Sequence, residues 1–306
     1  MPEPDDSPED DPLKAILRRV RRIELITRGK VKEKLGGEYH SSFKGQGIDF
    51  DDFREYQAGD EVRAIDWNVT ARMGEPFVKV FREERELTVM LVVDKSGSEA
   101  FGSALQTKKE LIAEVSALIA FSAISNNDRV GAILFTDTVE KFIPPKKGKK
   151  HVLRLIRDLL HFEPQGKATD VGAALEFLNR VATRKSLVFL ISDFIAEGYA
   201  RSLNQTARRH DLIAVNVSDP LERAMPAAQG LLWLEDLETG EPFVLDTASE
   251  AFRRYYGDRR AASQESRRRE FARRRIDQID ISTDADYVPR LVDFFRKRSR
   301  RRSQGR

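Results

Sequence analysis

Five side chains carry hard oxygen atoms at places where predicted strands or loops end: Asp94, Ser96, Ser98, Thr169 and Asp193. An apolar run at residues 87–93 leads into the first three, and a second run at residues 187–192 leads into the last. Because the carboxyl ends of parallel strands meet at one edge of a sheet, we expect these side chains to converge. Carboxylate and hydroxyl oxygens suit the octahedral shell of Mg²⁺ or Mn²⁺, so the set predicts a site for one of these ions.

The Asp-x-Ser-x-Ser spacing that follows the first run has a physical reason. Alternate residues of a turn that leaves a strand can point to one side, and Gly97 lets that turn tighten. Two carboxylates carry a charge of −2, which a divalent cation neutralises while it keeps a position for one anionic oxygen from outside. A structural interpretation stays open for single residues, since Ser96, Ser98, Thr169 and Asp170 could each cap a turn or a helix.

Other chemistries are poorly supplied by this composition. The chain has no cysteine, which excludes disulfides, thiolate metal sites and cysteine nucleophiles, and it has only four histidines. No phosphate-binding loop of the Gly-x-x-x-x-Gly-Lys-Ser/Thr type is present, and the glycines at positions 45 and 47 do not open a helix after a strand. We expect no enzymatic activity, with a metal-dependent phosphoester hydrolase as the alternative.

The elements that must position the five side chains alternate between strands and helices. The pattern predicts strands at residues 87–93, 129–136, 141–143, 187–192, 212–217 and 278–282. It predicts helices at residues 107–124, 151–161, 170–182, 199–209, 249–275 and 287–298, and a hairpin at residues 231–234 and 242–245. Such alternation indicates an α/β fold whose mostly parallel central sheet has helices on both faces.

Composition divides the chain into four parts. Residues 1–12 read as a disordered acidic tail, and residues 13–86 as an N-terminal amphipathic helix followed by a β-rich segment. Residues 87–298 form the α/β domain, and residues 299–306 read as a basic disordered tail. The N-terminus has acid where a secretory signal carries base, and no apolar run could span a bilayer, so we expect a cytoplasmic protein.

The five oxygen-bearing residues resemble the metal-ion-dependent adhesion site of von Willebrand factor type A domains, and the element order over residues 87–298 is similar to that fold. The preceding block contains Gly59-Asp60-Glu61-Val62-Arg63-Ala64-Ile65-Asp66-Trp67. It looks like the signature of the bacterial domain of unknown function 58 family, which carries a von Willebrand A-like domain behind this block.

The resemblance implies a protein-binding module rather than an enzyme. Its cation would accept an acidic side chain of a protein partner. Members of the family are similar to proteins encoded beside MoxR-type AAA+ ATPases, which implies such an ATPase as partner in chaperone-like maturation or assembly of other proteins. Many relatives carry N-terminal membrane spans, which this sequence lacks.

Two residues of the first motif depart from the family pattern. Lys95 lies between the first two predicted ligands, where it could point away or compete with the cation. Glu99 occupies a position where methionine is frequent, and could be a further ligand or block the open coordination position.

The block before the domain is rich in arginine, acid and aromatic residues. A structural interpretation pairs its arginines with its carboxylates and packs Tyr56 and Trp67 behind them. The alternatives are a partner-binding surface and an acid–base set of Asp49, Asp60 and Asp66.

Arginine is dense from Arg253 to the C-terminus, although the whole chain has 53 basic and 50 acidic residues and a net charge of +3. This near balance makes a polycation that coats nucleic acid improbable, and we expect no nucleic-acid partner. The basic helix is interpreted as a solvated face, or as a surface that contacts acidic lipid or an acidic partner. An adaptor for nucleic acid or membrane surfaces is the remaining alternative function.

Overall fold

A computed structural model of the chain describes residue 39 and residues 49–82, 86–97, 106–223, 230–235 and 242–304. The predicted acidic tail and the predicted amphipathic helix after it lie outside the described residues. Within the described part, no helix combines the length and the apolar character needed to cross a membrane.

Six strands form the central sheet in the order β10-β7-β6-β3-β4-β5. Their bounds are β3 (Thr88–Asp94), β4 (Arg129–Phe135), β5 (Val139–Lys146), β6 (Leu187–Ser192), β7 (Asp211–Ser218) and β10 (Asp277–Ser282). All neighbouring pairs are parallel except β4 and β5, which are antiparallel. The continuous apolar runs of β3 and β6 are buried on both faces, as central parallel strands require. This confirms the predicted α/β fold.

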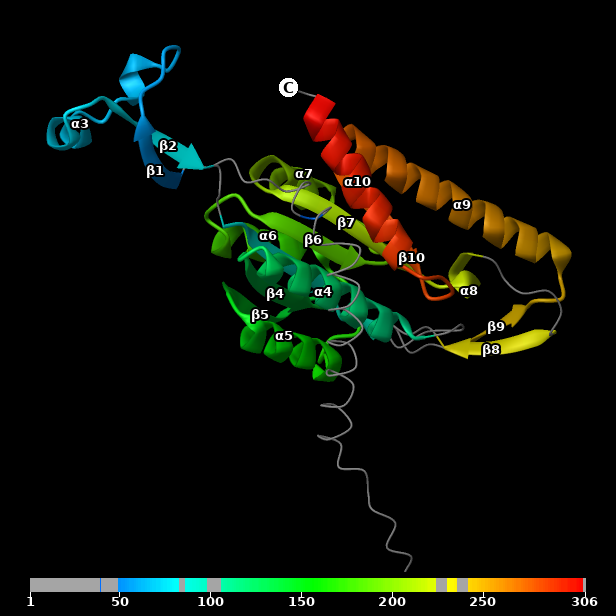
Figure 1. Ribbon diagram of the computed structural model, residues 1–306. Helices are drawn as coiled ribbons and strands as arrows, with labels where there is room; N and C mark the ends of the chain where they lie inside the picture. Colours follow the sequence, from blue (N-terminus) through cyan, green and yellow to red (C-terminus); the bar gives the residue numbers. More distant parts are fainter. Residues whose placement is uncertain are drawn as a thin grey trace, which may run out of the picture.

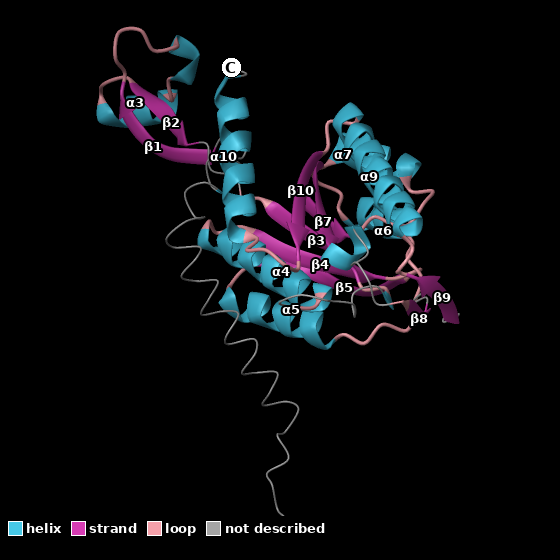
Figure 2. Ribbon diagram, turned by 90° about the vertical axis from the view of Figure 1, so that its right-hand side faces the viewer, coloured by secondary structure: helices cyan, strands magenta, loops and turns pink. Residues whose placement is uncertain are grey.

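Helices cover both faces of the sheet (Figures 1 and 2). Their bounds are α4 (Lys108–Ser125), α5 (Lys149–His161), α6 (Val171–Val181), α7 (Ala200–Arg209), α9 (Glu250–Arg273) and α10 (Val288–Gln304). Alternate side chains of β3 separate the two layers, because Leu91 packs with α4, α5 and α10 whereas Val92 packs with α6, α7 and α9. The strand order and the two helical layers give the domain its von Willebrand A-like fold.

Two smaller units are attached to this domain. Strands β1 (Asp49–Glu55) and β2 (Phe77–Arg82) form an antiparallel pair. The segment that connects them contains the short helices η2 (Val62–Ala64) and α3 (Trp67–Met73). Strands β8 (Leu231–Glu235) and β9 (Pro242–Asp246) form the predicted hairpin, after the four-residue helix α8 (Pro220–Arg223). Figure 1 shows the first unit projecting from one end of the molecule and the hairpin at the other.

The unit formed by β1, β2 and α3 shows the predicted pairing of arginine with acid. Arg54 holds Asp60 through two hydrogen bonds, of 2.7 and 2.6 Å, which lowers the pKa of Asp60 to about 2. The side chain of Asp66 caps α3 by accepting hydrogen bonds from the amides of Asn68 and Val69. Trp67 was predicted to pack behind these pairs, but this first residue of α3 is 66% exposed.

Two element boundaries differ from the prediction by more than two residues. Strand β5 continues through Pro144 and Pro145, because it lies at the edge of the sheet, where a missing N–H removes no necessary hydrogen bond. Helix α10 continues to Gln304, so the predicted disordered tail at residues 299–306 is wrong for residues 299–304. The extra turn is held against β10 by an ion pair of 2.9 Å between Arg301 and Asp277.

Candidate functional site

Asp94 ends β3 at the carboxyl edge of the sheet and is fully enclosed by its surroundings. Its Oδ1 accepts a hydrogen bond of 3.0 Å from the amide of Ser96, and its Oδ2 accepts one of 2.7 Å from the hydroxyl of Ser192 on β6. The second bond ties the end of β3 to the end of β6, directly beside Asp193. Two of the predicted ligands thus stand on adjacent strand ends.

Burial and the neighbouring charge act together on Asp94. Removal from water, followed by the negative charge of Asp193, raises the pKa of Asp94 from 3.8 to about 6, although the hydrogen bonds from Ser192 and Ser96 oppose the shift. Each additional positive charge near this carboxylate would therefore favour its ionised form.

Asp193 is held by the backbone of a tight turn. Its Oδ1 accepts a hydrogen bond of 3.2 Å from the amide of Ile195, and the next residue, Phe194, has a φ of 56°. A bulky side chain seldom adopts this left-handed conformation, and surrounding contacts must impose it. Here Phe194 packs edge-on against Phe271, with ring centroids 5.3 Å apart, and Arg267 donates a hydrogen bond of 3.1 Å to the carbonyl oxygen of Asp193.

The loop that carries Thr169 docks beside the turn after β3. The amide of Gly97 donates a hydrogen bond of 3.1 Å to the carbonyl of Lys167, and the amide of Asp170 donates one of 2.8 Å to the carbonyl of Thr136. Thr169 itself is half-buried at this junction. The structure therefore brings the loop of Thr169 to the same edge of the sheet as Asp94.

Lys108 is a residue of the site that the sequence patterns did not single out. It opens α4, and its side chain is only 2% exposed. Its ammonium lies 3.0 Å from Oδ2 of Asp193 and also contacts the carboxylate of Glu222 on α8. Burial alone would lower the pKa of Lys108, but the two carboxylates outweigh that effect and raise it, so the ammonium stays charged.

The first motif also contains Lys95, between the predicted ligands Asp94 and Ser96. Lys95 is buried, so its side chain does not project into solvent. Ser98 and Glu99 lie outside the described residues. Asp94, Ser96, Asp193 and the loop of Thr169 are thus the predicted parts that the structure places at one edge.

The donor set is rich in hydroxyl groups and poor in other ligands. Among the residues that the structure describes, no three His, Cys, Asp or Glu side chains form a group that could hold a metal ion. A cation at this edge would therefore depend on the hydroxyls and on water for most of its shell. Such a shell is typical of Mg²⁺, which keeps several waters when it binds to proteins.

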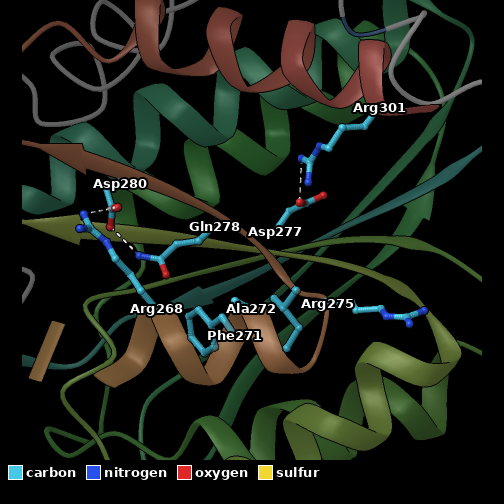
Figure 3. Close-up of a pocket in the computed structure, with 9 residues that line it drawn as sticks. Arg268, Phe271, Ala272, Arg275, Asp277, Gln278, Asp280 and Arg301 are labelled. Atoms are coloured by element: carbon cyan, nitrogen blue, oxygen red, sulfur yellow. Dashed lines mark hydrogen bonds and ion pairs between the residues drawn. The ribbon is translucent and has the colours of Figure 1, made fainter. Parts of the chain in front are cut away.

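A pocket of 710 Å³ lies elsewhere, between the end of α9, β10 and the end of α10 (Figure 3). Two of its three arginines are engaged with its own acids, because Arg268 pairs with Asp280 and Arg301 with Asp277, each at 2.9 Å. Figure 3 shows Arg268 and Gln278 reaching toward Asp280 from opposite sides. These internal pairs favour the structural interpretation of the basic C-terminal helices.

Comparison with known proteins connects this geometry with a family. The family described as "Protein of unknown function DUF58" matches residues 52–267. The protein Rv1480 of Mycobacterium tuberculosis is 31% identical over 296 residues, which cover 95% of this chain and 92% of that protein. The protein YeaD of Bacillus subtilis is 33% identical over 107 residues, which cover 35% of this chain and 24% of that protein.

Two solved structures also align with the chain. BatB from Bacteroides thetaiotaomicron aligns with a TM-score of 0.47 and 15% identity, over 70% of this chain and 99% of that one. The SpRpn10 VWA domain aligns with a TM-score of 0.38 and 11% identity, over 68% and 95% of the two chains. The family match and the strand order, rather than these two alignments, identify the chain: it belongs to the DUF58 family and carries a von Willebrand A-like domain.

Proposed function

We propose that this chain is a non-enzymatic protein-binding module whose site at the carboxyl edge of the sheet takes Mg²⁺ or Mn²⁺. The observation that supports this most strongly is the convergence of Asp94, Ser96 and Asp193, which come from two strand ends about a hundred residues apart in the sequence. Burial and the neighbouring charge of Asp193 raise the pKa of Asp94 to about 6, and a divalent cation at this edge would stabilise its ionised form, which favours a binding role.

The residues at this edge fit a small divalent cation by their chemistry. Asp94 and Asp193 supply negative charge, and Ser96 and Thr169 supply hydroxyl oxygens. The predicted ligand Ser98 lies outside the described residues. When bound, the cation would offer an open coordination position to a carboxylate from outside. The chain's own contribution is to fix the donors: Ser192 orients Asp94, and the turn at Phe194 orients Asp193.

The surroundings of the site favour protein binding over catalysis. His151 bonds to the carbonyl of Val130 at 2.8 Å, and the ring of His210 accepts a hydrogen bond from the amide of Ser186. Val130 and Ser186 lie where β4 and β6 begin, so both imidazoles are engaged at the opposite edge of the sheet. Neither is placed to act as a base for phosphoester hydrolysis at Asp94.

An exposed apolar surface lies at the same end of the molecule. Trp233 is 78% exposed, and Leu231 and Val244 on the same face of the hairpin are also exposed. Figure 1 shows this hairpin at the same end of the molecule as α8, whose Glu222 contacts Lys108. Exposed apolar side chains at the same end of the molecule as the cation site would add apolar contact area to a contact made by one carboxylate.

The partner that the family resemblance implies is a MoxR-type AAA+ ATPase, and we extend the proposal to it. In that role the chain would present client proteins or assembly intermediates to the ATPase. An acidic side chain of the ATPase or of the client would reach the cation.

A capture experiment tests the proposal. The immobilised chain should retain a MoxR-type AAA+ ATPase from the same genome in buffer that contains MgCl₂, and should release it in EDTA. Asp94→Ala and Thr169→Ala should abolish the capture, whereas Asp258→Ala, on the exposed side of α9, should leave it unchanged. Capture that persists in EDTA and in both site variants would refute the proposal.

A further inference from the structure

We infer that Lys108 is a built-in competitor of the divalent cation at this site, and that Glu222 provides the place to which its ammonium moves when the cation binds. This inference rests on the proposed cation site and adds to it a residue that sets the affinity. It concerns Asp193 in particular, which the ammonium contacts directly.

The ammonium occupies the face of Asp193 that a cation would need. Nζ of Lys108 lies 3.0 Å from Oδ2 of Asp193, and the other oxygen of that carboxylate is engaged by the amide of Ile195. Asp193 is 9% exposed, so little solvent is available to screen two positive charges placed on it together. Cation binding and the contact with Lys108 therefore oppose each other.

Glu222 gives the ammonium an alternative partner. Its carboxylate contacts Nζ of Lys108 and also accepts a hydrogen bond of 3.1 Å from the amide of Asp219. Asp219 is itself buried and accepts a hydrogen bond of 2.6 Å from the hydroxyl of Thr283, which follows β10. Glu222 is thus fixed to the end of the sheet and is independent of the turn that carries Asp193.

The lysine side chain can make this change because it is a flexible four-carbon stem with a compact charge. A small displacement toward Glu222 keeps the ammonium paired and frees Oδ2 of Asp193. Within the part of the chain that the structure describes, loss of Glu222 would leave Asp193 as the carboxylate paired with the ammonium, and would strengthen the competition with the cation.

Isothermal titration calorimetry of the metal-free protein with MgCl₂ alone tests the inference. Lys108→Met should bind Mg²⁺ at least about tenfold more tightly than the unmodified chain, and Glu222→Gln should bind it more weakly. Lys141→Met is a matched control. Lys141 on β5 lies 3.0 Å from Oδ2 of Asp158 on α5, and the side chain of Asp158 is also 9% exposed. Its Mg²⁺ affinity should equal that of the unmodified chain.

The outcomes separate this inference from the proposed function. Tighter binding by Lys108→Met supports the competition, and weaker binding by Glu222→Gln supports the move of the ammonium toward Glu222. Binding by Lys108→Met but not by the unmodified chain would keep Lys108 as a competitor and would overturn both that move and the proposed function. Binding by the unmodified chain that is equal to or tighter than that of Lys108→Met overturns the inference and leaves the proposed function intact. Absence of Mg²⁺ binding in both proteins overturns the inference and the proposed function. If circular dichroism shows that Lys108→Met is unfolded, Lys108→Gln takes its place.

Discussion

At the scale of single residues, the most informative contrast is between Asp94 and Lys108. Asp94 was predictable because an acid at the end of a buried apolar run is conspicuous in a sequence. Lys108 was not, because a lysine at the start of a helix looks like an ordinary surface residue. A signal was nevertheless present: positive charge is unfavourable at a helix N-terminus, and α4 opens with two lysines.

His210 gives a prediction about pH at the same scale. Burial, and then the charge of Arg209, lowers the pKa of His210 from 6.5 to about 4. Below pH 6.5 the imidazole of the unfolded chain gains a proton while that of the folded chain does not, so stability falls as the pH decreases toward 4. The loss from this residue should reach about 3 kcal/mol.

Urea unfolding at several pH values between 7 and 4 measures this loss. His210→Asn keeps an acceptor for the amide of Ser186 but has no titrating group, so its stability should fall less with acid. Because both proteins share all other titrating groups, the difference between them isolates His210. The exposed His161→Asn serves as control, and parallel pH profiles for His210→Asn and the unmodified chain would contradict the assignment.

At the scale of elements, the loop before Thr169 depends on one glycine. A Cβ at Gly166 would lie 2.0 Å from Oδ1 of Asp137 and 2.5 Å from the hydroxyl oxygen of Thr136. The amide of Gly166 also donates a hydrogen bond of 2.8 Å to Glu140 on β5, which fixes the loop. Gly166→Ala should therefore destabilise the protein by about 1 to 3 kcal/mol and weaken Mg²⁺ binding through displacement of Thr169.

Gly257→Ala is the matched control for this substitution. Gly257 lies within α9, and a Cβ there would meet no atom within 4 Å, so alanine should stabilise the helix by about 0.5 to 1 kcal/mol. Thermal unfolding followed by circular dichroism compares the two variants. Equal midpoints for Gly166→Ala and the unmodified chain would show that the loop adapts without cost.

Elements with a buried apolar run were predictable, and elements whose boundaries depend on tertiary contacts were not. Strand β6 has the bounds that its run of six apolar or small residues indicates. Strand β5 extends past Pro145 because it is an edge strand. Its place at the edge follows from its pairing with β4 and could not be predicted from its own residues. The aromatic residues of α9 predict its packed side in part: Phe271 is buried, whereas Tyr255 is 59% exposed.

At the scale of the whole molecule, the sequence predicted two helical layers on a parallel sheet but not which strands are neighbours. Strand β10 is the last strand in the chain and yet pairs with β7, at the edge of the sheet. The charges that close this edge come from α10 and are far apart in the sequence. The sequence therefore predicts a solvated basic face for these helices, although some of their arginines pair with carboxylates of the sheet.

Arg298 is the clearest case and gives the last prediction. Its side chain is 7% exposed, and its guanidinium contacts the carboxylates of Asp211, at the start of β7, and Asp277, at the start of β10. It thus fastens the last helix across the amino ends of two neighbouring strands. Arg298→Met would leave two carboxylates without this partner at a largely buried position, and should cost about 3 to 5 kcal/mol of unfolding free energy.

Arg301→Met is the comparison that tests whether burial or mere pairing matters. Arg301 also pairs with Asp277, at 2.9 Å, but it is 62% exposed, so its loss should cost less than about 1 kcal/mol. Urea midpoints of the two variants measure the difference directly. If both variants lost the same stability, the closure of the sheet edge by α10 would rest on its apolar contacts, such as that of Phe295 with Tyr39, rather than on the buried arginine.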